Sequence, residues 1–182
     1  IKNDLLLCLI KNAPYLSDWE RDILEIIREQ GLYFYPMMRT KIMDEGWAVY
    51  WHQTIMRELY RRKLLITAEW EEFALNNSFV LARSKKNFNP YLVGVRIYKD
   101  ILQKYGKEIL FHVRRAYTDR FFIEHFLNKE IVDDLELYIY QPKRKGNDIE
   151  YVIVEKDWRV IKEALIHSLS EFGPYIKVKN GH

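Results

Sequence analysis

A glycine lies inside a stretch that otherwise reads as one long helix. Between residues 37 and 62, apolar side chains recur every three or four positions, which predicts a helix with one broad apolar stripe: Met38, Ile42, Trp47, Tyr50, Trp51, Ile55 and Leu59. Gly46 interrupts this pattern. Glycine costs about 1 kcal/mol relative to alanine inside a helix, so a missing side chain must serve a purpose there. We expect a neighbouring helix or another segment to pack against Gly46 at close range.

Turn and capping signals divide the rest of the first two thirds of the chain into helices. One predicted helix begins near Ser17 and is ended or kinked by Pro36. Another begins at the Asn89-Pro90 pair and ends at Gly106. Further helices are predicted over residues 108–116 and 119–127, with a break near Thr118.

The hydrophobic period changes after residue 134. Alternating apolar residues predict strands near 135–140 and 151–154, with a polar loop over 142–148 between them. A helix is expected after Asp157 and a third strand over 175–178. The predicted fold is therefore mainly α-helical with a small C-terminal α+β (ββαβ) subdomain, divided into a helical body over 1–133 and the subdomain over 134–182.

Composition excludes several classes of protein. The longest apolar run, residues 5–10, is far shorter than the ~20 residues of a membrane span, so no span is predicted. The single cysteine, Cys8, cannot form an internal disulfide, which fits a reducing cytoplasm. Neither a phosphate-binding glycine loop nor a nucleophile elbow of the G-x-S-x-G type is present.

Positive charge is concentrated in the middle of the chain. Residues 57–120 contain 14 Lys and Arg against 7 Asp and Glu, a net charge of +7. Such a region can be a solvated surface, or it can face nucleic acid, an acidic partner or another segment of the same protein. No recognition-helix pattern groups these cations, so we expect no tight binding to nucleic acid.

Two residues of the central helix are candidates for metal binding or acid–base chemistry. Glu45 and His52 are seven positions apart, so they lie two turns apart on nearly the same side of the helix. A catalytic zinc site needs three protein ligands, and the chain contains no HExxH or HxxxH pattern to supply the others. The structural alternatives are that Glu45 pairs with Lys41 or joins a buried polar network, and that His52 only packs.

Several motifs together resemble one family, the stage V sporulation protein R (SpoVR) family. The central stretch, residues 40–52, reads TKIMDEGWAVYWH, and YFYP precedes it. Three later elements are also similar to that family: Asn89-Pro90-Tyr91 with Gly94, Lys99-Asp100-Ile101, and the block over residues 121–138. The chain starts at Ile1 without a methionine, so we expect it to be the C-terminal portion of a longer protein.

The resemblance implies a cytoplasmic protein of spore cortex formation. Its first implied role is non-enzymatic, as a regulatory or scaffold protein that contacts a protein partner or its own N-terminal segment. The alternative is a metal-dependent hydrolase related to zinc metallopeptidases, in which Glu45 is a ligand and the other ligands lie in an N-terminal segment outside this chain. We expect no cofactor in this chain, and zinc, if bound at all, in the full-length protein.

Overall fold

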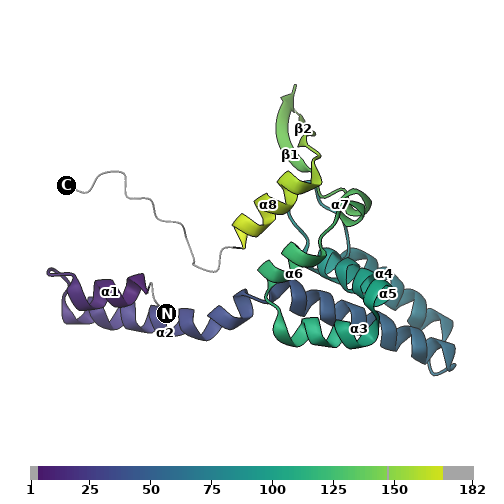
Figure 1. The fold of residues 1–182 in the computed structure, drawn as a ribbon, viewed down its shortest axis with the longest axis horizontal. Coiled ribbons are helices and arrows are strands. Elements are labelled where there is room, and N and C mark those ends of the chain that lie inside the picture. Colours follow the sequence, from purple (N-terminus) through teal and green to yellow (C-terminus); the bar gives the residue numbers. More distant parts are fainter. Residues whose placement is uncertain (1–3, 147, 170–182) are drawn as a thin grey trace. The chain divides into compact units, whose positions relative to one another are not determined.

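A computed structural model describes residues 4–146 and 148–169 of the chain (Figure 1). In this described part the fold is mainly helical, as the sequence predicts, and a two-stranded hairpin followed by a helix lies at its C-terminal end. The elements in order are α1 (Leu5–Asn12), α2 (Asp18–Met38), α3 (Lys41–Arg61), α4 (Thr67–Val80), α5 (Pro90–Ala116), α6 (Asp119–Phe126), α7 (Lys129–Leu135), β1 (Ile139–Lys145), β2 (Asp148–Glu155) and α8 (Trp158–Ser168).

The helices fall into two compact units, of which one contains α1 and α2 and the other spans Thr40–Leu169. The predicted domains, 1–133 and 134–182, stay a prediction.

In the first unit, α1 and α2 form a helical hairpin held by polar contacts. Asp4 caps α1 by accepting a hydrogen bond from the Leu7 amide at 2.9 Å, and it pairs with Arg28 of α2 at 2.8 Å. Arg21 donates to the Ala13 carbonyl at 2.9 Å, which ties α2 to the end of α1. Pro36 lies inside α2, which continues to Met38. The predicted start of the next helix at residue 37 is therefore four residues too early.

The second unit is built on the packing of α3 against α5. Buried apolar side chains from these two helices, and from α6, α7 and α8, form one core: Ile42, Met43, Val93, Ile97, Tyr98, Ile101, Phe122, Ile123, Ile131, Val132 and Ile161. At Gly106 the backbone of α5 leaves helical geometry, with φ of 83° and ψ of 179°. Gly106 therefore divides α5 into two helical segments, which confirms the predicted end of a helix there. Glycine suits this position because it adopts positive φ without a steric penalty.

The hairpin differs from the sequence prediction in its boundaries. Leu135 is the last residue of α7 and Glu136 follows it in a left-handed conformation, so the first strand begins at Ile139 and not at residue 135. Most of the predicted loop over 142–148 is strand, since Pro142 pairs with Tyr151 and Lys145 with Asp148. These residues are mostly exposed, so apolar alternation could not reveal them. The predicted third strand over 175–178 lies outside the described residues.

Candidate functional site

Gly46 of α3 lies directly against Gly94 of α5. A Cβ atom added at Gly46 would fall within 2.8 Å of the Val95 nitrogen and still closer to the backbone of Gly94. A Cβ atom added at Gly94 would lie 2.7 Å from the Gly46 Cα and would also collide with the Ile42 carbonyl oxygen. Because real Cβ contacts are longer, the two helices can cross at this distance only with glycine at both positions. The expectation that a neighbouring helix packs against Gly46 is confirmed.

The N-terminus of α3 is capped by a residue distant in the sequence. Asp119, at the start of α6, accepts hydrogen bonds from the Ile42 amide at 2.8 Å and from the Met43 amide at 2.9 Å. Its side chain is almost fully buried, with 2 % of the residue exposed. Burial raises the pKa of Asp119 to about 6, the two amide bonds act against this rise, and the charges of Asp44 and Glu45 add to it.

Glu45 lies half-buried beside this cap. Its Oε2 atom is buried and accepts no hydrogen bond from any described residue. Burial raises the pKa of Glu45; Lys41 opposes the rise and Asp44 contributes to it. Glu45 therefore has a carboxylate oxygen that is desolvated and unused, which is the state of a residue able to bind a cation or accept a proton.

Asp44 and Tyr98 complete the polar surroundings of the cap. Asp44 accepts a hydrogen bond from the Thr40 hydroxyl at 2.8 Å and forms an ion pair with Arg114 of α5. The hydroxyl of Tyr98 is buried without a hydrogen-bond partner among the described residues. Burial raises the pKa of Tyr98, with Arg114 acting against the rise and Asp44 adding to it. The aromatic ring packs against Trp47, with ring centroids 5.4 Å apart.

His52 lies in different surroundings from Glu45. It is exposed, and its ring packs edge-on against Phe73 of α4 with centroids 4.9 Å apart. Seven residues correspond to about 10 Å along a helix axis. Across residues 4–146 and 148–169, no group of three His, Cys, Asp or Glu side chains is placed to hold a metal ion. The assignment of Glu45 and His52 as metal ligands stays a prediction.

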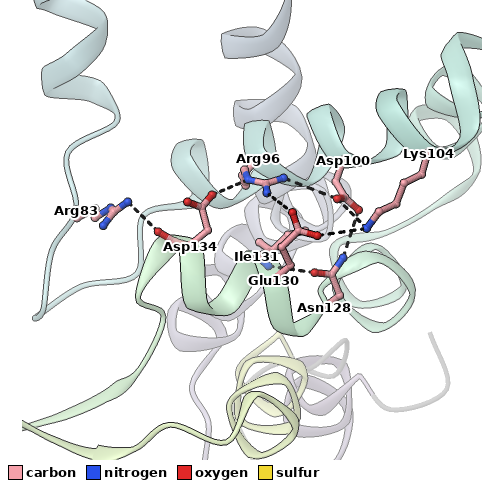
Figure 2. Close-up of polar contacts among 8 residues, drawn as sticks. All are labelled: Arg83, Arg96, Asp100, Lys104, Asn128, Glu130, Ile131 and Asp134. Atoms are coloured by element: carbon pink, nitrogen blue, oxygen red, sulfur yellow. Dashed lines mark hydrogen bonds and ion pairs between the residues drawn. The ribbon is translucent and has the colours of Figure 1, made fainter.

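A second polar cluster joins α5 to α7 (Figure 2). Its centre is Asp100, of which only 4 % is exposed. Lys104 approaches one carboxylate oxygen at 2.9 Å, and the Asn128 amide donates to the other at 3.3 Å. Arg96 lies 3.8 Å from Asp100 and reaches across to Asp134 at 2.7 Å. The cluster balances a buried carboxylate with two cations and fixes α7 against α5.

The comparisons with known proteins support one assignment. The family model described as "SpoVR like protein" matches residues 1–173. The chain belongs to the SpoVR-like family. It is 30 % identical over 207 aligned positions to the protein named "Uncharacterized protein YcgB" from Escherichia coli (strain K12), and the match covers 98 % of this chain and 41 % of that protein. The chain thus spans about two fifths of the relative's length. No solved structure matched the chain.

The residues by which the chain resembles the SpoVR family have defined structural contacts. Gly46 and Gly94, from two of the motifs, meet at the helix crossing. Asn89 caps α5 by accepting from the Leu92 amide at 3.2 Å, and its side-chain nitrogen donates to the Val80 carbonyl at 2.9 Å. Asp100, from a third motif, is the centre of the α5–α7 cluster.

The described residues include no helix long and apolar enough to cross a membrane.

The roles of Asp119 as the cap of α3 and of Arg96 in the α5–α7 cluster were not predicted from the sequence. Asp119 was placed at a helix start, where an acidic residue is common, and nothing local indicates that it caps a helix 77 positions earlier in the chain. Arg96 lies in the basic region over residues 57–120, for which the sequence leaves a solvated surface and several binding partners open. An arginine four residues before an aspartate on one helix face was the available signal.

Proposed function

We propose that this chain is the helical scaffold of a longer SpoVR-like protein that acts through protein contacts and catalyses no reaction itself. The observation that carries this proposal is the use of the family-like residues. Gly46 and Gly94 allow two helices to cross, Asn89 caps one of them, and Asp100 joins α5 to α7. Each therefore has a role in holding the second unit together, and none of these roles needs a substrate.

Exposed apolar side chains on α2 support a role in protein contacts. Trp19 is 63 % exposed, and Ile23, Ile26 and Ile27 are 46 %, 56 % and 50 % exposed. They recur at helical spacing, and clustered apolar exposure of this kind marks surfaces that bind other proteins. We propose a protein partner or the protein's own N-terminal segment as the binder, since the chain spans only part of its relative.

The proposed place in the cell comes from the family alone. SpoVR-like proteins are expected to act in the cytoplasm in spore cortex formation, and we extend that role to this chain as a proposal. Deleting the full-length gene in a spore-forming host tests it. Loss of cortex would support the role, whereas normal cortex in the deletion strain would contradict it.

A metal-dependent hydrolase is the alternative, and one observation favours it. The Oε2 atom of Glu45 is buried with no hydrogen-bond partner among the described residues, so Glu45 fits as one zinc ligand. Because this chain does not bring three ligands together in its described part, the remaining ligands would have to come from elsewhere in the full-length protein. The zinc would supply Lewis-acid chemistry and an activated water there.

Metal analysis separates the two functions. Plasma emission spectroscopy of the purified full-length protein, after exposure to zinc and desalting, should find far less than one zinc per chain. About one zinc per chain, lost in Glu45→Ala but kept in the matched variant Glu58→Ala, would support the hydrolase and overturn the scaffold proposal. Glu58 lies on the same helix and pairs with Arg61 and Arg62, so it controls for loss of a carboxylate.

A further inference from the structure

We propose that a groove in the second unit binds a small organic anion, a compact apolar body that carries a phosphate or carboxylate. The groove has a volume of about 300 Å³ and lies between the loop that precedes α5, the segment that joins α7 to β1, and α8. Three segments distant in the sequence therefore build it. The inference goes beyond the proposed function, because nothing in the scaffold role requires a ligand.

The floor of the groove is apolar. Leu135 and Ile161 are 6 % and 3 % exposed and belong to the core, and Leu92, Leu137 and Leu165 pack against that core while lining the groove. An apolar floor inside a concave site favours burial of an apolar or aromatic body, because binding removes apolar surface from water.

One wall of the groove is basic. Lys85 and Lys86 line it, and among the described residues neither has a carboxylate partner. The Lys85 ammonium lies 5.9 Å from the centre of the Tyr140 ring, and the Lys86 ammonium lies 5.5 Å from that of Tyr151. A third cation, Arg83, faces Glu136 at 3.7 Å. Two lysines without acidic partners leave the wall positively charged, which selects an anionic ligand.

The loop over residues 83–89, which carries Lys85 and Lys86, is held in place by hydrogen bonds without a ligand. At one end the Arg83 guanidinium donates to the Asp134 carbonyl oxygen at 2.8 Å, a contact drawn in Figure 2. At the other end the Asn89 side chain donates to the carbonyl oxygens of Val80 and Ala82 at 2.9 and 3.0 Å. Inside the loop the Ser84 hydroxyl accepts from the amide of Asn87 at 3.1 Å. A loop ordered in this way loses little conformational entropy on binding.

The size of the groove indicates a compact ligand. A volume of about 300 Å³ is at the lower end of the range of small-molecule pockets. It has room for one aromatic ring or a short aliphatic chain together with its anionic group. Asn89 belongs to a family-like motif and lines this groove as well as capping α5, so this motif contributes to the site.

Titration by two-dimensional ¹H–¹⁵N NMR with three probes tests the proposal. Phenyl phosphate offers both an aromatic body and an anion, benzyl alcohol offers only the body, and inorganic phosphate offers only the charge. We expect phenyl phosphate to shift the amides of residues 83–89 and 161–168, with an affinity at least about fivefold higher than either other probe, since an apolar contact and an ion pair are each worth about 1 kcal/mol. Equal affinity for phenyl phosphate and either simpler probe would overturn the proposal, as would shifts outside the groove or no shifts at millimolar concentration.

Two variants and a control locate the binding. Ala164 lines the groove on the exposed side of α8, so Ala164→Trp should fill the groove and abolish binding while the spectrum stays dispersed. The double variant Lys85→Ala/Lys86→Ala should weaken phenyl phosphate binding about fivefold to tenfold, since exposed ion pairs are individually weak but two are lost together. Lys143→Ala/Lys145→Ala removes the same charge from β1, outside the groove, and should change affinity less than twofold. An equal loss in both double variants would show general charge attraction and contradict a specific site.

Discussion

The crossing of α3 and α5 makes Gly46→Ala a strongly destabilising substitution. The added methyl would meet backbone atoms of Gly94 and the Val95 nitrogen at 2.8 Å or less, whereas carbon atoms rest about 3.5–4.0 Å apart. Backbone atoms cannot rotate away as a side chain can, so the helices must separate. Overpacking of this kind costs roughly 1–3 kcal/mol, and we expect the upper end. The higher helix propensity of alanine offsets about 1 kcal/mol of this cost. The free energy of unfolding should therefore fall by about 2 kcal/mol.

Urea unfolding followed by tryptophan fluorescence measures this loss, because Trp47 and Trp51 lie next to the crossing and pack against each other with ring centroids 5.6 Å apart. A loss of about 2 kcal/mol corresponds to a melting temperature lower by roughly 6–10 °C for a unit of this size. Gly31→Ala is the matched control. Gly31 lies inside α2 and a Cβ atom there would meet nothing within 4 Å, so this change should be neutral or stabilise by up to about 1 kcal/mol.

A Gly46→Ala variant as stable as the parent, or more stable, would refute the close crossing. In that case helix propensity alone would govern the position, and α3 would present an open surface at Gly46. Gly94→Ala gives an independent check, because its methyl would collide with the Ile42 carbonyl oxygen and lie 2.7 Å from the Gly46 Cα. It should destabilise the protein by a similar amount.

Three further outcomes follow from the charged groups. The pKa of Asp119 is raised to about 6, above its value in the unfolded chain, so its contribution to stability is complete below about pH 4 and is lost as the pH rises through about 6. Asp119→Asn should remove this pH dependence from the free energy of unfolding, measured by urea unfolding at several pH values. A ¹³C NMR titration of the Asp119 carboxyl group with a midpoint near pH 4 would contradict the raised pKa. Asp100→Ala leaves Lys104 and Arg96 without their buried partner and should lower the free energy of unfolding by about 2–3 kcal/mol. Lys129→Ala removes an exposed ion pair with Asp133 and should lower it far less; equal effects of the two variants in chemical unfolding would refute the distinction. Duplex DNA should bind more weakly than about 1 μM at physiological salt in fluorescence anisotropy, and tighter binding with a steep salt dependence would refute this expectation.

The sequence predicted those features that depend on neighbouring residues. The glycine inside an apolar helical stripe indicated a close approach at Gly46, and Gly106 indicated a helix end, because each departure from local propensity has a local cost. The partner of Gly46 could not be predicted in the same way. Gly94 lies 48 positions later, and only the packing of α3 against α5 brings the two glycines together.

The polar groups at the N-terminus of α3 were predicted only in part, again because some of them come from distant parts of the sequence. Glu45 was singled out from its motif, but the residue that caps the same helix, Asp119, comes from another helix and has no local signal.

The predicted strand boundaries were wrong for a different reason. The hairpin is mostly exposed, so its strands carry no regular apolar alternation, and the alternation at Leu135 and Leu137 belongs to the end of α7 and the turn that follows.

Anomalous X-ray diffraction from crystals of the full-length protein, grown with equimolar zinc and measured across the zinc absorption edge, tests the scaffold account most directly. We predict no anomalous peak within zinc-bonding distance, about 2.0–2.2 Å, of the Glu45 carboxylate oxygens. We also predict that Gly46 and Gly94 remain in backbone contact at the crossing. A strong peak bonded to the Oε2 atom of Glu45, with further ligands supplied from outside this chain, would contradict the account and establish the metal-dependent alternative.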